Sequence, residues 1–387
     1  MKRTALGIAT AAALGLSPAS GQVFVHPGAL HTNADFTRMA AQVAKGTEPW
    51  LGGWKVLLKN PHAQLGWSPH PAGIVYRGKD GSHPENYRLL YNDISAAYAL
   101  ALRWKVSGDD AYADKAIAIL DAWPGTLTGI GGNSDRFLAS GIYGYEFANA
   151  AEILRTSERW PAQNFNRFKA MMLNVFYPMN HDFLARHNGA KIDHYWANWD
   201  LANMASMIAI GILTDRRDIY AEAVEYFKHG RGNGAIEHVV WKIHPDGLGQ
   251  TQESGRDQGH NTLNVSLLGA ICQMAWNQGD DLFGFDSNRV LKGVEYVAQY
   301  NLGGDVPYTE YVNSDTVQKT ISSDGRGNGR PAWELFYNHY VVLKGLSAPN
   351  IARFAEKLRP EGGGGDYGPN SGGYDQLGYG TLTYTLK

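Results

Sequence analysis

Apolar residues recur at helical spacing along most of the chain. Residues 92–108 place six of them on one helix face, with Asn92 or Asp93 as the expected cap and Gly108 as the end: Ile94, Ala97, Tyr98, Ala101, Leu102 and Trp104. The same pattern recurs in segments 110–123, 144–156, 164–177, 198–214, 217–230, 261–279, 288–303 and 332–345. It predicts an all-α protein, an (α/α) toroid or incomplete barrel of antiparallel helix pairs, over residues 22–360.

Long connections interrupt this helical pattern. Residues 60–88, 229–252 and 302–330 lack helical periodicity, and long ordered loops on a helical scaffold are where binding and chemistry usually lie. Residues 361–387 form a glycine-rich C-terminal tail that we expect to be loop-like and unpacked. Strand-like alternation is scarce apart from residues 380–386 within that tail.

The first 21 residues have the features of a secretory signal peptide. Lys2 and Arg3 precede an apolar run from Ala5 to Leu16, and small residues follow at positions 19–21. No other segment approaches the roughly 20 apolar residues of a membrane span. We therefore expect a secreted protein without a membrane partner.

Composition narrows the class of ligand. The formal net charge of −2 indicates neither a nucleic-acid surface nor a basic membrane patch, and we expect a monomer. Aromatic residues make up 12% of the chain, which favours a carbohydrate cleft because flat rings bind sugar faces. The single cysteine, Cys272, is expected to be buried. The N-glycosylation sequon at Asn264 lies at the start of a helix that we also expect to be buried, which argues against a glycan there.

The segment 194–200 crowds polar and aromatic groups at the start of an apolar helix. A helix N-terminus favours an anion, and Asn198 beside it can hydrogen-bond a carboxylate. The rings of Tyr195 and Trp199 offer faces for a sugar. The alternative is that Asn198 or Asp200 only caps the helix while the rings pack.

The segment 250–264 is the most unusual stretch of the sequence. Glu253, Arg256, Asp257 and His260 fall within two helical turns, ahead of a uniformly apolar helix. Arg256 and His260 are four residues apart and can point into one cleft. Arg256 can hold a carboxylate through two parallel hydrogen bonds, Glu253 and Asp257 can orient it or cap the helix, and His260 can abstract or donate a proton.

Loop tyrosines and a later arginine extend the candidate site. Tyr308 and Tyr311 lie in the loop after residue 302, where a phenol can act as acid or base. Arg330 precedes the last helical segments, where its ordinary role would be to fasten them. No HExxH motif or cysteine set occurs, so we expect no metal and no cofactor.

Six stretches together make the chain resemble the alginate lyase superfamily of polysaccharide lyases, specifically the group around polysaccharide lyase family thirty-eight. They lie in residues 26–39, 91–104, 193–204, 244–261, 274–285 and 300–311. The resemblance implies an (α/α) toroid whose cleft binds an anionic uronic-acid polymer, alginate or glucuronan. It also implies cleavage by β-elimination, which leaves 4,5-unsaturated uronate ends.

The resemblance also implies roles for particular residues. Asn198 and His260 match the positions that face the substrate carboxylate, and Arg256 would be a further donor. A tyrosine takes the C5 proton, returns one to the leaving oxygen, or does both; Tyr311 is the first choice, then Tyr308, then Tyr195. We expect Tyr195, Trp199, Glu253, Tyr308 and Arg330 to bind substrate.

Two other functions fit the same residues. An inverting glycoside hydrolase on the same toroid would need two acids across the cleft, drawn from Asp93, Glu253 and Asp257. A non-catalytic polysaccharide-binding protein would need only the cleft. The preferred uronic acid and the choice between endo and exo action stay open at this point.

Overall fold

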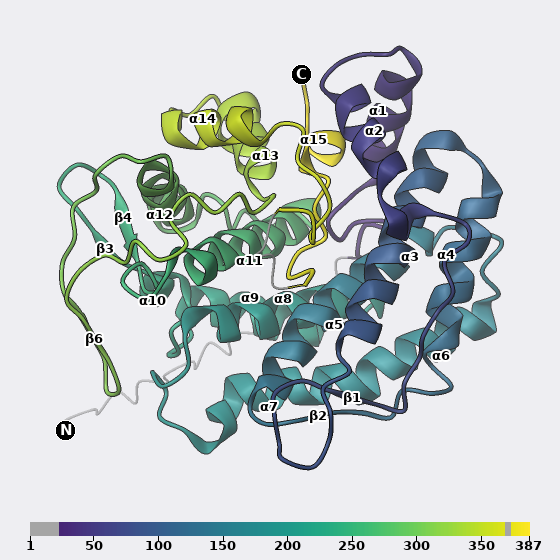
Figure 1. Ribbon diagram of the computed structural model, residues 1–387, viewed down its shortest axis with the longest axis horizontal. Coiled ribbons are helices and arrows are strands. Elements are labelled where there is room, and N and C mark those ends of the chain that lie inside the picture. Colours follow the sequence, from purple (N-terminus) through teal and green to yellow (C-terminus); the bar gives the residue numbers. More distant parts are fainter. Residues whose placement is uncertain (1–22, 368–372) are drawn as a thin grey trace, which may run out of the picture.

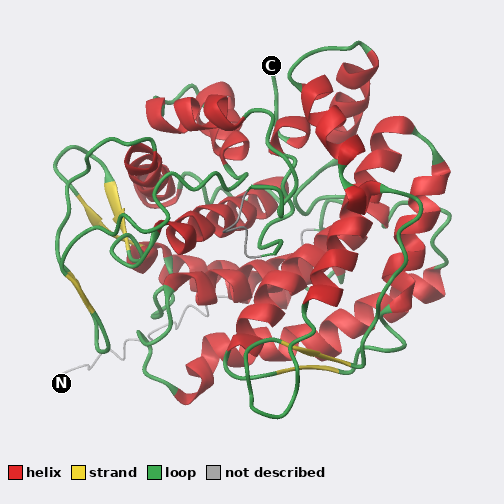
Figure 2. Cartoon of the chain, in the orientation of Figure 1, coloured by secondary structure: helices red, strands yellow, loops and turns green. Residues whose placement is uncertain are grey.

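The computed structural model describes residues 23–367 and 373–387 (Figure 1). The expected signal peptide lies outside these described residues. Helices dominate, and Figure 2 shows the strands as short pieces at the edge of the helical body. The expected all-helical character is therefore confirmed. None of the described helices is long and apolar enough to cross a membrane.

The long helices form the centre of the molecule. Consecutive ones pack as pairs, α3 with α4, α8 with α9 and α11 with α12, and α5 packs most extensively against α8. Their bounds are α3 Arg88–Ser107, α4 Asp110–Ala122, α5 Asp135–Leu154, α8 Ala197–Leu213, α9 Arg217–His229, α11 Gln258–Asn277 and α12 Phe285–Asn301.

Shorter elements surround this centre. The short α-helices are α1 Asn33–Ala44, α2 Trp50–Lys59, α6 Ala162–Met171, α7 Tyr177–Arg186, α10 Ile236–Val239, α13 Trp333–Phe336, α14 Pro349–Leu358 and α15 Gly380–Thr383. Two 3₁₀ turns cover Pro61–Ala63 and His187–Gly189, and two π-helical segments cover Met172–Phe176 and Tyr337–Leu343. Strands pair as β1 Ile74–Tyr76 with β2 Gly129–Gly131 in parallel, and as antiparallel β3 Val240–Ile243 with β4 Gly249–Thr251 and β5 Tyr311–Val312 with β6 Val317–Gln318.

Helix α8 is the most enclosed element. Every one of its residues is buried, and its buried polar residues are hydrogen-bonded, as Asn203 is to the Trp199 carbonyl and Ser206 to Asn180. Two glycines let α5 approach it closely: a Cβ on Gly141 would lie 2.7 Å from the backbone of Ala202, and one on Gly144 would lie 2.1 Å from the Ser206 hydroxyl. This close packing fixes the start of α8, where part of the candidate site lies.

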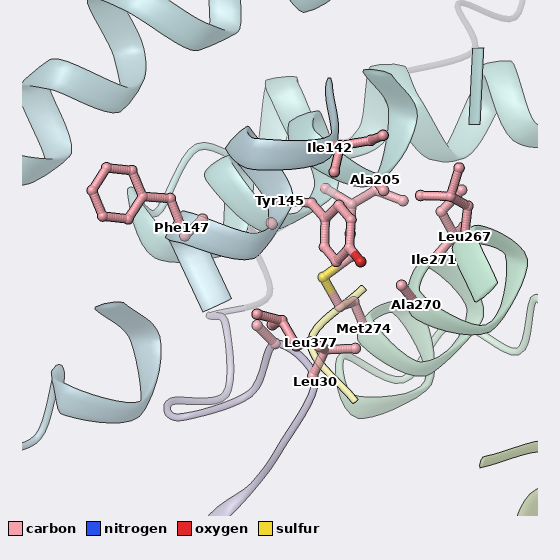
Figure 3. Packing of buried hydrophobic residues seen from close by; sticks show 14 of the residues in the cluster. Leu30, Ile142, Tyr145, Phe147, Ala205, Leu267, Ala270, Ile271, Met274 and Leu377 are labelled. Carbon is pink, nitrogen blue, oxygen red and sulfur yellow. The ribbon is translucent and has the colours of Figure 1, made fainter. Parts of the chain in front are cut away.

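The core continues from α5 and α8 to α11 and to both ends of the described chain. Figure 3 shows Tyr145 of α5 between Ala205 of α8 and Met274 of α11, with Leu30 and Leu377 below them in the view. The Tyr145 hydroxyl donates to the Asp375 carbonyl at 3.1 Å. Burial of these side chains supplies most of the force that holds the helices together.

Two expectations about these elements are wrong. Helix α3 begins at Arg88, not at Asn92 or Asp93, and Asp93 is fully buried inside it because its carboxylate accepts hydrogen bonds from the indoles of Trp67 and Trp123, both at 3.0 Å. Its predicted end at Gly108 is confirmed, with a left-handed φ of 72°.

The C-terminal tail is packed where the structure describes it, so the expectation of an unpacked segment is also wrong. Leu382 is fully buried against Gly53 of α2, and Tyr379 is 3% exposed. Residues 380–383 form a helical turn and not a strand. Glycines permit the tight course of this segment, while the tyrosines and leucines between them supply the apolar surface.

Candidate active site

The segment before α11 is built around the cap of that helix. Asp257 is the N-cap residue, and its Oδ1 accepts a hydrogen bond from the His260 backbone N–H at 2.8 Å. Its Oδ2 lies 2.7 Å from His260 Nδ1. Burial would raise the pKa of Asp257, but hydrogen bonds from His260 and the attraction of Arg256 outweigh that effect and lower it. The capping role expected for Asp257 is confirmed, and a carboxylate orients the imidazole.

Arg256 connects His260 to Glu253. Its Nη1 donates to Glu253 Oε2 at 2.7 Å, and its Nη2 lies 3.2 Å from His260 Nε2. The guanidinium also lies over the ring of Trp196, 4.7 Å from its centroid. With Nδ1–H donating to Asp257, Nε2 carries the lone pair that accepts from Arg256, so the two contacts assign the tautomer of His260.

Glu253 is fully buried and holds Arg256 in position through the hydrogen bond to Nη1. Its Oε1 accepts from the Asn198 backbone N–H at 2.9 Å, from Asn198 Nδ2 at 2.7 Å and from Asn264 Nδ2 at 3.1 Å. The neighbouring Gln252 Oε1 accepts from the Ala197 N–H at 3.1 Å. The helix N-terminus of α8, which the sequence suggested for an anionic ligand, is therefore occupied by the Glu253 carboxylate.

This arrangement gives two residues contacts that the sequence did not indicate. Asn198 is fully buried, and its Nδ2 donates to Glu253 Oε1 at 2.7 Å while its Oδ1 has no hydrogen-bond partner among the described residues. A substrate contact by Asn198 or by the buried Glu253 stays a prediction. Asn264, whose sequon reads as a glycan acceptor, is buried as expected and holds Glu253 as well.

Two pockets meet at Arg256 and His260. The His260 pocket, of about 460 Å³, has a lining that includes His260, Asp257, Arg77, Arg330, Asp324 and Asp375. The aromatic pocket, of about 430 Å³, is lined by Arg256 and by Tyr195, Trp196, Trp199 and His194. The side chain of His260 is 43% exposed and that of Arg256 is 23% exposed, so both reach the cleft.

The aromatic pocket has the rings expected of a sugar-binding surface. Tyr195 and Trp199 pack with their ring centroids 4.6 Å apart, and Asn188 Nδ2 donates to the Tyr195 hydroxyl at 3.0 Å. The turn between β5 and β6 closes the far side of the pocket through Asn313 and Asp315. Tyr195 and Trp199 therefore line one pocket together, and substrate binding by them stays a prediction.

Arg330 lines the His260 pocket but is held by its own neighbours. Its side chain is 3% exposed, and it donates to the Gly259 carbonyl at 3.2 Å and to the side chains of Asp375 and Gln376. These contacts fasten the C-terminal segment beside the start of α11. The structure thus supports a fastening role more than the expected direct contact with substrate.

The two loop tyrosines differ in what their hydroxyls contact. The Tyr308 hydroxyl donates to the Gln318 carbonyl at 2.9 Å, which pins the loop before β5 to β6, so substrate binding by this group is not supported. The Tyr311 hydroxyl lies 3.4 Å from both Gln252 Nε2 and Asn233 Oδ1, next to the residues that cap α8. Burial raises the pKa of Tyr311, and burial raises the pKa of Tyr308 to about 12.

Among the described residues, no group of three His, Cys, Asp or Glu side chains could hold a metal ion. The titratable groups of the cleft instead pair with one another. Proton transfer and charge pairing are the chemistry that this arrangement can perform.

Several residues of the site were not singled out from the sequence. Trp196 lies in segment 194–200, but the sequence does not indicate that its ring would stack on Arg256. Gln252 and Arg77 come from loops whose course only the fold determines. The density of polar residues around Gln252 was the one available signal.

With this geometry in view, the comparisons with known proteins decide the family. A family model described as "Alginate lyase" matches residues 42–306, more than half of the chain. The chain belongs to the alginate lyase family. As a member of this family it is a polysaccharide lyase, as expected. No curated protein matches the chain.

Solved structures of alginate lyases share the fold. An alginate lyase from Bacteroides ovatus has a TM-score of 0.60 at 15% identity, with 94% of this chain and 100% of that chain covered. Alginate lyase A1-III from Sphingomonas species A1 has a TM-score of 0.58 at 13% identity, with 96% and 100% covered. A variant of alginate lyase A1-III in complex with a tetrasaccharide has a TM-score of 0.62 at 14% identity, with 96% and 99% covered. These similarities confirm the (α/α) toroid.

Proposed function

We propose that the protein is an exported lyase that cleaves a uronic-acid polymer by β-elimination, with alginate as its substrate and glucuronan as the alternative. The observation that carries the proposal is the contact of Arg256 with the lone pair of His260 Nε2, at the junction of the two pockets. While Arg256 donates to His260 Nε2, that nitrogen cannot accept a proton. An anionic substrate that binds Arg256 would free it to act as a base.

The substrate carboxylate takes the place of His260 as the acceptor for Arg256. A guanidinium binds a carboxylate more strongly than a neutral imidazole, because the hydrogen bond is charge-assisted and can be bidentate. Glu253 holds the guanidinium through Nη1, so the N–H groups of Nη2 are available to the substrate once they leave His260. Neutralising the carboxylate in this way makes the C5 proton of the sugar acidic enough to remove, because the enolate-like intermediate is stabilised.

His260 then removes the C5 proton with its free Nε2. Asp257 accepts from Nδ1–H and stabilises the imidazolium that forms. The electron pair of the C5–H bond forms the C4–C5 double bond, and the C4–O bond to the neighbouring sugar breaks. The leaving oxygen takes a proton, and the chain ends in a 4,5-unsaturated uronate.

We assign the donation of that proton to Tyr311. Its raised pKa keeps the phenol protonated at neutral pH, as a proton donor must be. The contacts with Gln252 and Asn233 place the hydroxyl beside the loop that carries Glu253 and Arg256. Tyr195, in the wall of the aromatic pocket, is the alternative donor.

The named acids do not form the pair that a hydrolase needs. Asp93, on α3, accepts hydrogen bonds from the indoles of Trp67 and Trp123. Glu253 is buried and paired with Arg256, and Asp257 is hydrogen-bonded to His260. An inverting hydrolase needs two carboxyl groups about 6.5–9.5 Å apart with room for a water between them. This arrangement further favours elimination.

The product distinguishes these chemistries. The wild-type protein is incubated separately with alginate and with glucuronan, and both ultraviolet absorbance of the unsaturated uronate and new reducing ends are followed. We expect absorbance and reducing ends to rise together on alginate. Reducing ends that rise without absorbance would refute elimination, and absorbance on glucuronan alone would move the substrate assignment to that polymer.

Export is tested on the leader itself. The full chain is expressed in a secreting host and the exported protein is sequenced from its N-terminus. We expect the mature chain to begin at residue 22. Protein that stays in the cells with residues 1–21 attached would contradict export.

A further inference from the structure

A third pocket lies next to the aromatic pocket along the chain. This basic pocket, of about 410 Å³, is defined by Lys228, His229, Arg231 and His238, with Ile192 at its edge. Ile192 precedes by two residues the His194 that lines the aromatic pocket. The segment 192–195 is therefore shared by the two pockets.

The connection between them is fixed by hydrogen bonds. Asn233, two residues after Arg231, is 5% exposed, and its Nδ2 donates to the Asp193 carbonyl at 2.9 Å and to the Tyr195 carbonyl at 2.7 Å. The loop that carries Arg231 is thereby held against the wall of the aromatic pocket. These two hydrogen bonds therefore fix the position of the basic pocket relative to the aromatic pocket.

The cations of the basic pocket lack acidic partners. Arg231 is exposed and makes no hydrogen bond or ion pair with any described residue. Lys228 lies over the ring of Phe285, 5.6 Å from its centroid, and pairs with no described acid. Surface arginines of nearby helices are by contrast paired, Arg186 with Asp182 and Arg216 with Asp218. Glu237 is the one acid in the described lining.

We propose that the basic pocket is a distal subsite that binds carboxylates of a uronate chain whose reacting sugar lies at Arg256. The inference rests on the proposed function. A polyuronate carries a carboxylate on every sugar, so a chain that extends through the aromatic pocket and around segment 192–195 presents anions to Lys228 and Arg231. Binding of a carboxylate to the unpaired Arg231 costs little free energy, because no ion pair within the protein has to be broken first.

Such a subsite strengthens the binding of long chains only. A short oligomer bound at Arg256 does not reach the basic pocket, whereas a polymer fills both. The subsite is remote from the reacting carbon, so its contacts are the same in the ground state and the transition state. It therefore lowers KM for the polymer without changing kcat.

The test uses the double variant Lys228→Ala/Arg231→Ala and a matched control, Arg167→Ala/Lys169→Ala on α6. The control also removes one lysine and one arginine, and Lys169 likewise lies over a phenylalanine, 4.9 Å from the Phe165 centroid. Helix α6 contributes to neither pocket of the cleft. Circular dichroism establishes that both variants fold.

The steady-state constants are measured on a uronate polymer and on its trisaccharide. We expect KM on the polymer to rise about 3- to 10-fold in the Lys228/Arg231 variant, the effect of two exposed charge contacts, with kcat and the trisaccharide constants unchanged. The control variant should match the wild type. An unchanged KM on the polymer, or an equal rise on the trisaccharide, would overturn the subsite.

A binding readout separates this inference from the proposed function. Retardation of each protein in a native gel containing alginate needs no catalysis. If the wild type forms no unsaturated product, the proposed function fails, but loss of retardation in the Lys228/Arg231 variant alone would still support a polyuronate site. Equal retardation of the two variants would count against it.

Discussion

Glu253 links stability and activity, and its replacement gives a quantitative prediction. The carboxylate accepts four hydrogen bonds at 2.7–3.1 Å, from the backbone and side chain of Asn198, from Asn264 and from Arg256. Glu253→Gln keeps an acceptor for the Oε1 contacts but turns an amide N–H toward Arg256. Glu253→Ala removes every acceptor.

The energies follow from these contacts. Loss of the one charge-assisted bond in Glu253→Gln should cost about 1.5–3 kcal/mol of unfolding free energy. Glu253→Ala leaves buried amide donors unpaired and an arginine without its partner, for which about 3–5 kcal/mol is typical. Because Arg256 is 23% exposed, water can solvate its charge, and we expect about 3 kcal/mol, at the lower end.

Urea unfolding at neutral pH measures both variants against the wild type. The free energy of unfolding should fall in the order wild type, Gln, Ala, and KM on alginate should rise in both variants because Arg256 is no longer held. If Glu253→Ala unfolds within about 1 kcal/mol of the wild type, the carboxylate does not anchor the site and this reasoning is refuted.

Three further outcomes follow from the same structure. Tyr311→Phe should lower kcat by at least about 100-fold if its phenol donates the proton, while Tyr308→Phe, whose hydroxyl only pins a loop, should stay within about 3-fold; equal kcat values would remove Tyr311 from the reaction. Burial beside Glu334 raises the pKa of Glu361 to about 8, above its unfolded value, so the stability contributed by its protonated form is complete below about pH 4 and is lost as the pH rises toward 8. The stability of the wild type relative to Glu361→Gln should therefore fall between pH 5 and 8, and a constant difference would contradict the raised pKa. Cys272 is fully buried with a raised pKa, so a thiol reagent should modify it only after unfolding, and rapid labelling of the native protein would contradict its burial.

The helices could be predicted because their signal is local. A period of 3.6 residues marks α4, α9 and α12 directly, and Gly108 ends α3 where its left-handed φ is needed. The start of α3 could not be predicted from the helical period and the capping residues. Asp93 looks like a cap in the sequence, but two indole donors from distant segments bind it inside the helix.

The candidate site could be predicted only in part, because only its contacts between residues close in the sequence give a local signal. Arg256, Asp257 and His260 lie within one turn, so their cluster is a property of the local sequence. The position of Glu253 at the N-terminus of α8, where it accepts from Asn198, could not be predicted because the two residues are 55 apart in the sequence. Packing of the C-terminal tail was missed because its helix α15 packs against α2, α1 and α13, which the glycine content of the tail does not reveal.

The central claim is that the lone pair of His260 Nε2 takes the C5 proton of a uronate. The most direct measurement is kcat/KM for unsaturated product on alginate, for the wild type and for His260→Ala of equal thermal stability. We predict a loss of about 10²- to 10⁴-fold, the usual contribution of a positioned base. Activity within about 3-fold of the wild type would show that another group removes the proton.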